Sequence, residues 1–254
     1  MRDEKIISVI DLIIFYGDDL ILDNISFEVI EGEILVILGT SGCGKSTLLR
    51  QMVGLSHPWA GKIIIDGNEI TSRDEEAFNR TIRKIGILFQ SGALIGSMTL
   101  AENVALPIIE FTDIPVQSVE NLVKMKLSMV GLTGYENHLP SEISGGMKKR
   151  AGLARAMALN PKILFLDEPT AGLDPVIAAE IDELILGINR SIGTTMVIVT
   201  HELDSIFKVA QRVIMLDSIT KGILDEGDPR DLKMNSSEPF VRQFFNRQAG
   251  SAKK

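Results

Sequence analysis

A glycine-rich segment at residues 39–47 combines residue types that bind phosphate. It has the sequence Gly-Thr-Ser-Gly-Cys-Gly-Lys-Ser-Thr, satisfies the pattern G-x-x-x-x-G-K-[ST], and lies between an apolar run and a helical pattern. Backbone N–H groups of such a loop surround phosphate oxygens, and the positive end of the following helix dipole adds to the attraction. We expect Lys45 to reach the β- and γ-phosphates, Ser46 to hold Mg²⁺ and Thr47 to meet the α-phosphate. The residues predicted to bind nucleotide here are Gly39, Ser41, Gly42, Cys43, Gly44, Lys45, Ser46 and Thr47.

Two adjacent carboxylates, Asp167 and Glu168, directly follow an apolar run at residues 163–166. Such a run predicts a buried strand, and parallel sheets bind their ligands at the carboxyl ends of the strands. The two carboxylates can therefore meet a nucleotide held by Lys45. We expect Asp167 to orient Mg²⁺ through its water shell, and Glu168 to accept a proton from the attacking water or to polarise it.

Further motifs follow in an order known from one family. The segment Ile-Ser-Gly-Gly-Met at residues 143–147 lies between the two phosphate-site motifs and resembles the signature of ABC ATPases, usually Leu-Ser-Gly-Gly-Gln. Tyr16 is similar to the A-loop aromatic that stacks on adenine, and Gln90 is similar to the Q-loop glutamine. Asp174, in Ala-Gly-Leu-Asp, is similar to the D-loop aspartate, and His201 to the switch histidine. The resemblance covers essentially the whole chain, and the ordered set is far more specific than any single motif.

The resemblance to ABC ATPases implies an ATP-hydrolysing subunit that works as two head-to-tail copies. In that family each ATP lies between the Lys45 loop of one copy and the Ser144 loop of the other. Ser144, Gly145 and Gly146 open a helix, so they offer a hydroxyl, N–H groups and a dipole end to an anion. The resemblance also implies that Gln90 is a magnesium ligand, that Asp174 contacts nucleotide and that His201 is catalytic.

Three features leave alternatives open. Ile143 and Met147 depart from the usual signature residues; the isoleucine is a volume-conserving change, while Met147 removes a polar contact. The basic residues 148–150 favour a solvated helix face over a role near phosphate. Phe15 adjoins Tyr16, and either ring could pack in the core instead of stacking on adenine.

Three segments resemble a narrower branch, the Mla/Mce-type ATPases of phospholipid transport. They lie at residues 90–104, 147–150 and 201–206. This resemblance implies ATP-driven phospholipid transport between membranes, of the kind that maintains outer-membrane lipid asymmetry. Its implied partners are an integral membrane permease of the MlaE type, an Mce-domain protein and a small STAS-domain subunit.

Two other functions within the ABC ATPase family remain possible interpretations of the sequence. One is the ATPase of a small-solute importer or of a lipoprotein-release system. The other is a soluble ABC ATPase of DNA repair or translation. The absence of sustained heptads between Lys45 and Ser144 argues against the coiled-coil repair members, and translation members carry two cassettes in one chain.

The apolar and helical patterns around these residues predict an α/β fold. Short apolar runs predict strands at residues 6–16, 25–30, 34–38, 62–65 and 85–89, and the pair Asp66-Gly67 predicts a hairpin turn. Residues 99–159 have a helical pattern that opens on a capping box, Thr99-Leu100-Ala101-Glu102. Beyond it, apolar runs at 163–166, 196–199 and 213–216 alternate with helical patterns at 176–189 and 203–210. Such alternation predicts a parallel sheet with helices on both faces.

Combined with the resemblance, this pattern predicts a P-loop NTPase core of the RecA-like type. An N-terminal antiparallel β-subdomain and an inserted α-helical subdomain carrying the signature complete the predicted fold. We expect a single ABC ATPase domain over residues 1–254, with residues 1–90 and 160–235 forming the nucleotide-binding core with its β-subdomain. Residues 91–159 form the helical subdomain, and 236–254 a last helix and a frayed tail.

Composition excludes several classes of protein. The net charge of −8 opposes the basic surface that nucleic-acid binding requires, so we expect no nucleic-acid partner. Cys43 is the single cysteine and cannot form an intramolecular disulfide. No apolar stretch approaches the roughly 20 residues of a membrane-spanning helix. We therefore expect a peripheral protein on the cytoplasmic face of the inner membrane, with the transport path in another chain.

Overall fold

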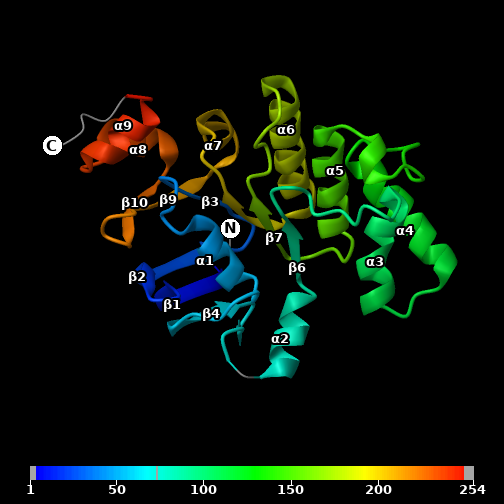
Figure 1. Ribbon diagram of the computed structural model, residues 1–254, viewed down its shortest axis with the longest axis horizontal. Helices are drawn as coiled ribbons and strands as arrows, with labels where there is room; N and C mark the ends of the chain where they lie inside the picture. The colour runs from blue at the N-terminus through cyan, green and yellow to red at the C-terminus, as the bar shows by residue number, and fades with distance from the viewer. Residues whose placement is uncertain (1–3, 73, 249–254) are drawn as a thin grey trace.

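The computed structural model describes residues 4–72 and 74–248 and folds them into two β-sheets surrounded by helices (Figure 1). Within these residues the larger sheet has the strand order β10-β9-β3-β8-β7-β6, and the smaller one β2-β1-β4-β5. The larger sheet contains β3 (Ile34–Gly39), β6 (Ile85–Leu88), β7 (Ile163–Asp167), β8 (Thr195–Val199), β9 (Arg212–Leu216) and β10 (Ile223–Gly227). The smaller sheet contains β1 (Lys5–Tyr16), β2 (Asp19–Ile30), β4 (Ala60–Ile65) and β5 (Asn68–Glu69).

Helices occupy both faces of the larger sheet. They are α1 (Lys45–Met52), α2 (Glu75–Ile82), α3 (Leu100–Phe111), α4 (Val116–Met129), α5 (Gly145–Ala156), α6 (Pro175–Ile192), α7 (Leu203–Val209), α8 (Pro229–Asn235) and α9 (Pro239–Phe245), with a 3₁₀ turn at Pro140–Glu142. In Figure 1 the antiparallel strands β1, β2 and β4 lie at the lower left, and α3 and α4 project on the right.

The larger sheet is parallel except for β10, which pairs antiparallel with β9. Every residue of β3 is buried, because both of its faces are covered. Ile34, Val36 and Leu38 pack in the core shared with α3 to α9, while Leu35 and Ile37 face α1 and the smaller sheet. This alternation places α1 between the two sheets and confirms the predicted parallel sheet with helices on both faces.

Two local predictions are confirmed. Thr99 caps α3 through a capping box: the backbone N–H of Glu102 donates to the Thr99 hydroxyl, and the Glu102 carboxylate accepts from the Thr99 N–H at 2.7 Å. Asp66 and Gly67 form the turn of the β4–β5 hairpin, and both have positive φ, as a two-residue turn of this type requires.

Two parts of the fold differ from the sequence expectation. Strand β2 begins at Asp19, six residues before the predicted start at residue 25, because its pairing with β1 extends into the tip of the hairpin. Helix α2 was not predicted; it has only eight residues, of which Ala77 and Thr81 are buried. Asp74 caps its N-terminus, where the side chain accepts from the N–H of Ala77.

The predicted last helix is α9, in which Val241 and Phe245 are buried while Phe240 is 38% exposed. The predicted frayed tail falls on residues 249–254, outside the described residues. Within residues 4–72 and 74–248, no helix has both the length and the apolar character needed to span a bilayer.

Candidate functional site

A cavity of about 580 Å³ opens where β3 ends and α1 begins. It brings together most of the residues that the sequence singled out, from segments far apart in the chain. Its lining consists of Ile21, Gly39, Thr40, Ser41, Gly42, Gly44, Lys45, Ser46, Thr47, Gln90, Glu168, His201 and Phe244. Because β3, β7 and β8 are parallel neighbours, the loops after all three strands reach the same edge of the sheet.

The loop between β3 and α1 needs glycine for steric reasons. Gly44, at the N-cap of α1, has φ of +99°, and a Cβ there would lie 2.8 Å from the Cγ2 of Ile21. A Cβ on Gly39 would lie 2.4 Å from the carbonyl oxygen of Leu216 on β9. The backbone can therefore follow this tight curve only without side chains at these positions.

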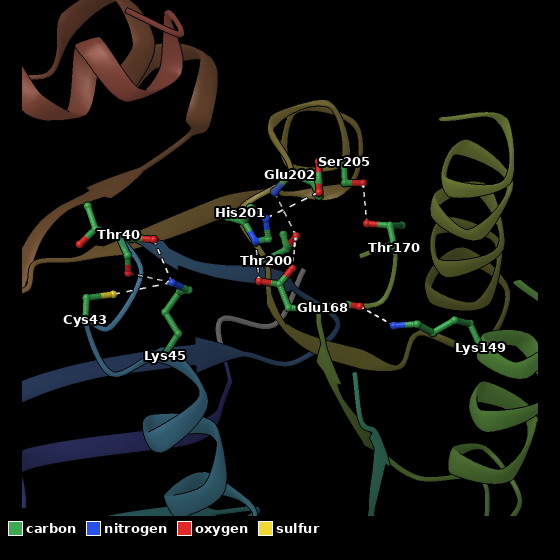
Figure 2. A network of polar contacts seen from close by, with 11 residues as sticks. Thr40, Cys43, Lys45, Lys149, Glu168, Thr170, Thr200, His201, Glu202 and Ser205 are labelled. Atoms are coloured by element: carbon green, nitrogen blue, oxygen red, sulfur yellow. Dashed lines mark hydrogen bonds and ion pairs between the residues drawn. The ribbon is translucent and has the colours of Figure 1, made fainter. Parts of the chain in front are cut away.

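The side chain of Lys45 folds back over the glycine-rich loop that precedes it. Its ammonium donates to the carbonyl oxygens of Gly39 at 2.9 Å and Thr40 at 3.0 Å (Figure 2). Cys43 is buried under the loop and does not line the cavity. Burial raises the pKa of its thiol, with Lys45 opposing the shift, so the thiol stays protonated and unreactive at neutral pH.

Glu168 is held through all of its polar groups. Its Oε1 lies 2.7 Å from the Nδ1 of His201, and its Oε2 accepts from the Thr200 hydroxyl at 3.2 Å (Figure 2). Its backbone N–H donates to the carbonyl oxygen of Val199 on β8. The Glu168 side chain is about 10% exposed, whereas that of His201 is 58% exposed. The carboxylate therefore lies in the buried part of the cavity wall, and the imidazole in the part open to solvent.

Asp167 has the features of a cation ligand. Its Oδ1 is buried and has no hydrogen-bond partner among the described residues. Burial raises the pKa of this carboxyl and Glu168 raises it further, while Arg50, Lys149 and a hydrogen bond with Ser46 oppose the shift. A buried oxygen without a partner beside a hydroxyl fits a hard divalent cation. Gln90, in the loop after β6, lines the same cavity and can add an amide oxygen.

Lys149 corrects the expectation of a solvated basic face after the signature. Its side chain is buried, and its Nζ donates to the backbone carbonyl of Glu168 at 2.6 Å. Arg150 is half-buried and pairs with Glu180 at 2.6 Å. This burial could not be predicted from the sequence, because it depends on how α5 packs against β6 and the neighbouring helices.

Seven predicted residues do not line this cavity. Cys43 and Asp167 belong to the segments that border it, and the other five are Tyr16, Ser144, Gly145, Gly146 and Asp174. Tyr16 is 74% exposed. The hydroxyl of Ser144 accepts from the N–H of Met147 and caps α5, and Asp174 caps α6. A Cβ on Gly146 would lie 2.6 Å from the Cγ2 of Ile177, so this glycine lets α5 pack closely on α6.

Four further residues that contribute to the site were not predicted from the sequence. Ile21, Thr40 and Phe244 line the cavity, and Thr200 holds Glu168. Thr40 stood within the glycine-rich motif, and Thr200 directly before His201. Ile21 and Phe244 come from the β1–β2 hairpin and from α9, and only the tertiary structure brings them to the loop.

Residues 22–171 match the family described as ABC transporter. The chain belongs to the ABC transporter family. It is 43% identical over 231 residues to the probable ribonucleotide transport ATP-binding protein mkl of Mycobacterium tuberculosis, covering 91% of this chain and 64% of that protein. It is 40% identical over 225 residues to the methionine import ATP-binding protein MetN of Carboxydothermus hydrogenoformans, covering 89% of this chain and 66% of that one. The chain thus spans less than two thirds of the length of these relatives.

Solved structures of ABC proteins share the fold. The ATP-binding cassette MJ0796, in a dimeric post-hydrolysis state bound to ADP and phosphate, superposes with a TM-score of 0.79 at 32% identity, over 87% of this chain and 98% of that one. The protein cbiO1 of Clostridium perfringens, part of the ABC transporter complex cbiONQ, superposes with a TM-score of 0.81 at 29% identity, over 90% of both chains. The predicted fold class, with its antiparallel β-subdomain and parallel core, is confirmed.

Proposed function

We propose that the protein is the ATP-hydrolysing subunit of an ABC transporter. One observation carries the proposal: a single cavity joins the Lys45 loop to Glu168 and His201. Ammonium and loop N–H groups suit a triphosphate, and a carboxylate held on both oxygens suits activation of water. The 43% identity to a protein named as a transport ATP-binding protein supports the same assignment.

In this proposal each side chain has a separate task. Lys45 and the loop amides bind the phosphates, and Glu168 accepts a proton from the attacking water. His201, hydrogen-bonded to Glu168 Oε1, fixes the carboxylate and borders the γ-phosphate. Ser46, Gln90 and Asp167 would hold Mg²⁺, which neutralises phosphate charge when bound.

We further propose that two copies complete the site. The N-terminus of α5 presents exposed Ser144 and Gly145 away from the cavity of its own chain, so its N–H groups and dipole are available to a nucleotide on a second copy. Exposed Asp174 lies at the start of α6 beside it and would contribute to the same junction. Exposed Tyr16 would stack on adenine. The dimeric state of the similar cassette MJ0796 supports this arrangement.

The replacement Glu168→Gln tests the catalytic assignment. The amide keeps the shape of the side chain but cannot take a proton, so we expect ATP binding to persist, turnover to fall by at least about a hundredfold and a nucleotide-bound dimer to accumulate. Phosphate release, binding of labelled ATP and size-exclusion chromatography with ATP report these three effects. A variant that keeps turnover within about twofold of the wild type would show that the base lies elsewhere.

For the cargo, we propose phospholipid. Three segments support it, residues 90–104, 147–150 and 201–206, through their similarity to Mla/Mce-type ATPases. The proposal includes an MlaE-type permease, an Mce-domain protein and a STAS-domain subunit as partners, and a position on the cytoplasmic face of the inner membrane. A net charge of −8 agrees with the absence of a nucleic-acid partner.

A small solute is the second candidate cargo. The relatives named for methionine import and for ribonucleotide transport favour it. Purification of the tagged protein with its membrane complex, followed by mass spectrometry of subunits and extracted small molecules, separates the two. Copurified phospholipid with an Mce-domain protein supports the lipid proposal, and an amino-acid or nucleotide permease overturns it.

A further inference from the structure

Glu168 adopts a backbone conformation that side chains rarely take. Its φ is +47°, in the left-handed region, although it is not glycine. Such a conformation persists only where the surroundings determine it. Val199, the last residue of β8, accepts a hydrogen bond from its N–H, and the two carboxylate oxygens are held by Thr200 and His201. The backbone carbonyl points the other way and needs its own partners (Figure 2).

That carbonyl has two donors. The N–H of Ala171, in the following turn, lies at 3.3 Å, and the Nζ of Lys149 lies at 2.6 Å. Lys149 is the closer of the two, and it comes from α5 rather than from the local loop (Figure 2). A charged donor forms the stronger hydrogen bond. Lys149 is therefore the contact by which the signature helix reaches the residue that activates water.

Burial of the Lys149 ammonium costs desolvation free energy, which a residue with a purely structural role could avoid. Its side chain is 5% exposed, and burial lowers its pKa while Glu168 and Asp167 oppose the shift. An uncharged side chain of similar length could fill the same space without desolvating an ammonium. What an uncharged, apolar side chain could not supply is the hydrogen bond to the Glu168 carbonyl.

We propose that Lys149 is a positioning residue that holds the backbone of Glu168 so that its carboxylate stays aimed into the cavity. The inference rests on the proposed ATPase function and adds a residue to it. The ammonium restrains rotation of the 168 peptide from one side, and His201 and Thr200 restrain the carboxylate from the other. Without Lys149 the carbonyl keeps one long hydrogen bond, and the carboxylate samples orientations in which it cannot take the proton.

The hydrogen bond between Lys149 and Glu168 would also connect the two nucleotide sites of the proposed dimer. The N-terminus of α5 would meet the nucleotide of a second copy through Ser144, and Lys149 lies just over one turn further along the same helix. A displacement of α5 on nucleotide contact would therefore move the carbonyl of Glu168 in the same chain. Lys149 thus makes the proposed base responsive to the state of the opposite site.

The replacement Lys149→Met tests the proposal in the full chain copurified with its membrane complex. Methionine keeps the length and removes the donor. We expect kcat to fall by about tenfold or more, as small displacements of a catalytic group do, while KM and the affinity for a non-hydrolysable ATP analogue change by less than roughly threefold. Thermal unfolding should occur near the wild-type temperature, because removal of a desolvated ammonium offsets the loss of its hydrogen bond. We expect the Hill coefficient for ATP to fall toward one.

Two further variants sharpen the result. Lys149→Arg retains a charged donor and should recover most of the lost kcat. Lys148→Met removes the same charge from the adjacent half-buried position, where the side chain makes no hydrogen bond or ion pair with the described residues, and should stay within about twofold of the wild type.

The proposal is overturned if Lys149→Met keeps kcat within about twofold of the wild type, or if kcat and analogue affinity fall by the same factor. It is also overturned if Lys148→Met is equally impaired. Glu168→Gln in the same preparation separates this failure from failure of the function itself. A wild type that hydrolyses ATP, a Glu168→Gln variant that does not and a fully active Lys149→Met variant would refute the positioning role and leave the ATPase assignment standing.

Discussion

A buried carboxyl on α6 makes the stability of this protein depend on pH. Asp182, on α6, is 4% exposed; its Oδ2 accepts from the Ser205 hydroxyl, and its Oδ1 has no partner among the described residues. Burial is the main cause that raises its pKa from 3.8 to about 6. Since folding raises this pKa, its stabilising contribution is complete below pH 3.8 and is lost as the pH rises through about 6.

The size of the effect follows from proton linkage. A carboxyl with these two pKa values changes the free energy of unfolding by about 3 kcal/mol in total, and by about 1.4 kcal/mol between pH 5 and pH 8. Asp182→Asn removes the titration while keeping an oxygen that can accept from Ser205. We therefore expect the variant to gain about 1.4 kcal/mol relative to the wild type on going from pH 5 to pH 8.

Urea denaturation at the two pH values, followed by circular dichroism, measures this double difference. The exposed carboxylate Asp113 provides the matched control, because Asp113→Asn removes one charge without removing a buried group. Parallel pH dependences of the wild type and Asp182→Asn would refute the reasoning. A change in Asp113→Asn as large as in Asp182→Asn would do the same, since net charge would then explain both.

Two other replacements test the phosphate loop and a helix cap. Lys45→Ala should abolish ATP binding, because it removes the charge expected at the β- and γ-phosphates; equilibrium binding of labelled ATP measures this, and affinity close to that of the wild type would contradict the assignment. Thr99→Ala removes the capping box of α3 and should lower the free energy of unfolding by about 1 kcal/mol in urea titrations. An unchanged midpoint would show that the cap contributes nothing measurable.

Local signals in the sequence were sufficient for much of the fold. The Asp66-Gly67 turn, the capping box at Thr99 and the apolar runs of the parallel strands each depend on neighbours in the chain. Helix α2 escaped prediction because it is only eight residues long and just two of them are buried. The same limit applies to the site: the motifs indicated Lys45, Glu168 and His201, whereas Lys149 and Phe244 reach their places through helix packing.

The strained conformation of Glu168 explains how two consecutive carboxylates can serve one site. In an extended strand, successive side chains point to opposite faces, so Asp167 and Glu168 would diverge if β7 simply continued. At Glu168 the chain instead turns to a φ of +47°, and its carboxylate meets His201, while the carboxylate of Asp167 stays near Ser46, Arg50 and Lys149, which lower its pKa against the effect of burial. A left-handed residue of this kind costs about 1–3 kcal/mol. The contacts with β8, His201 and Lys149 offset that cost. The contacts that hold the strained backbone of Glu168 are therefore also those that aim its carboxylate at the cavity.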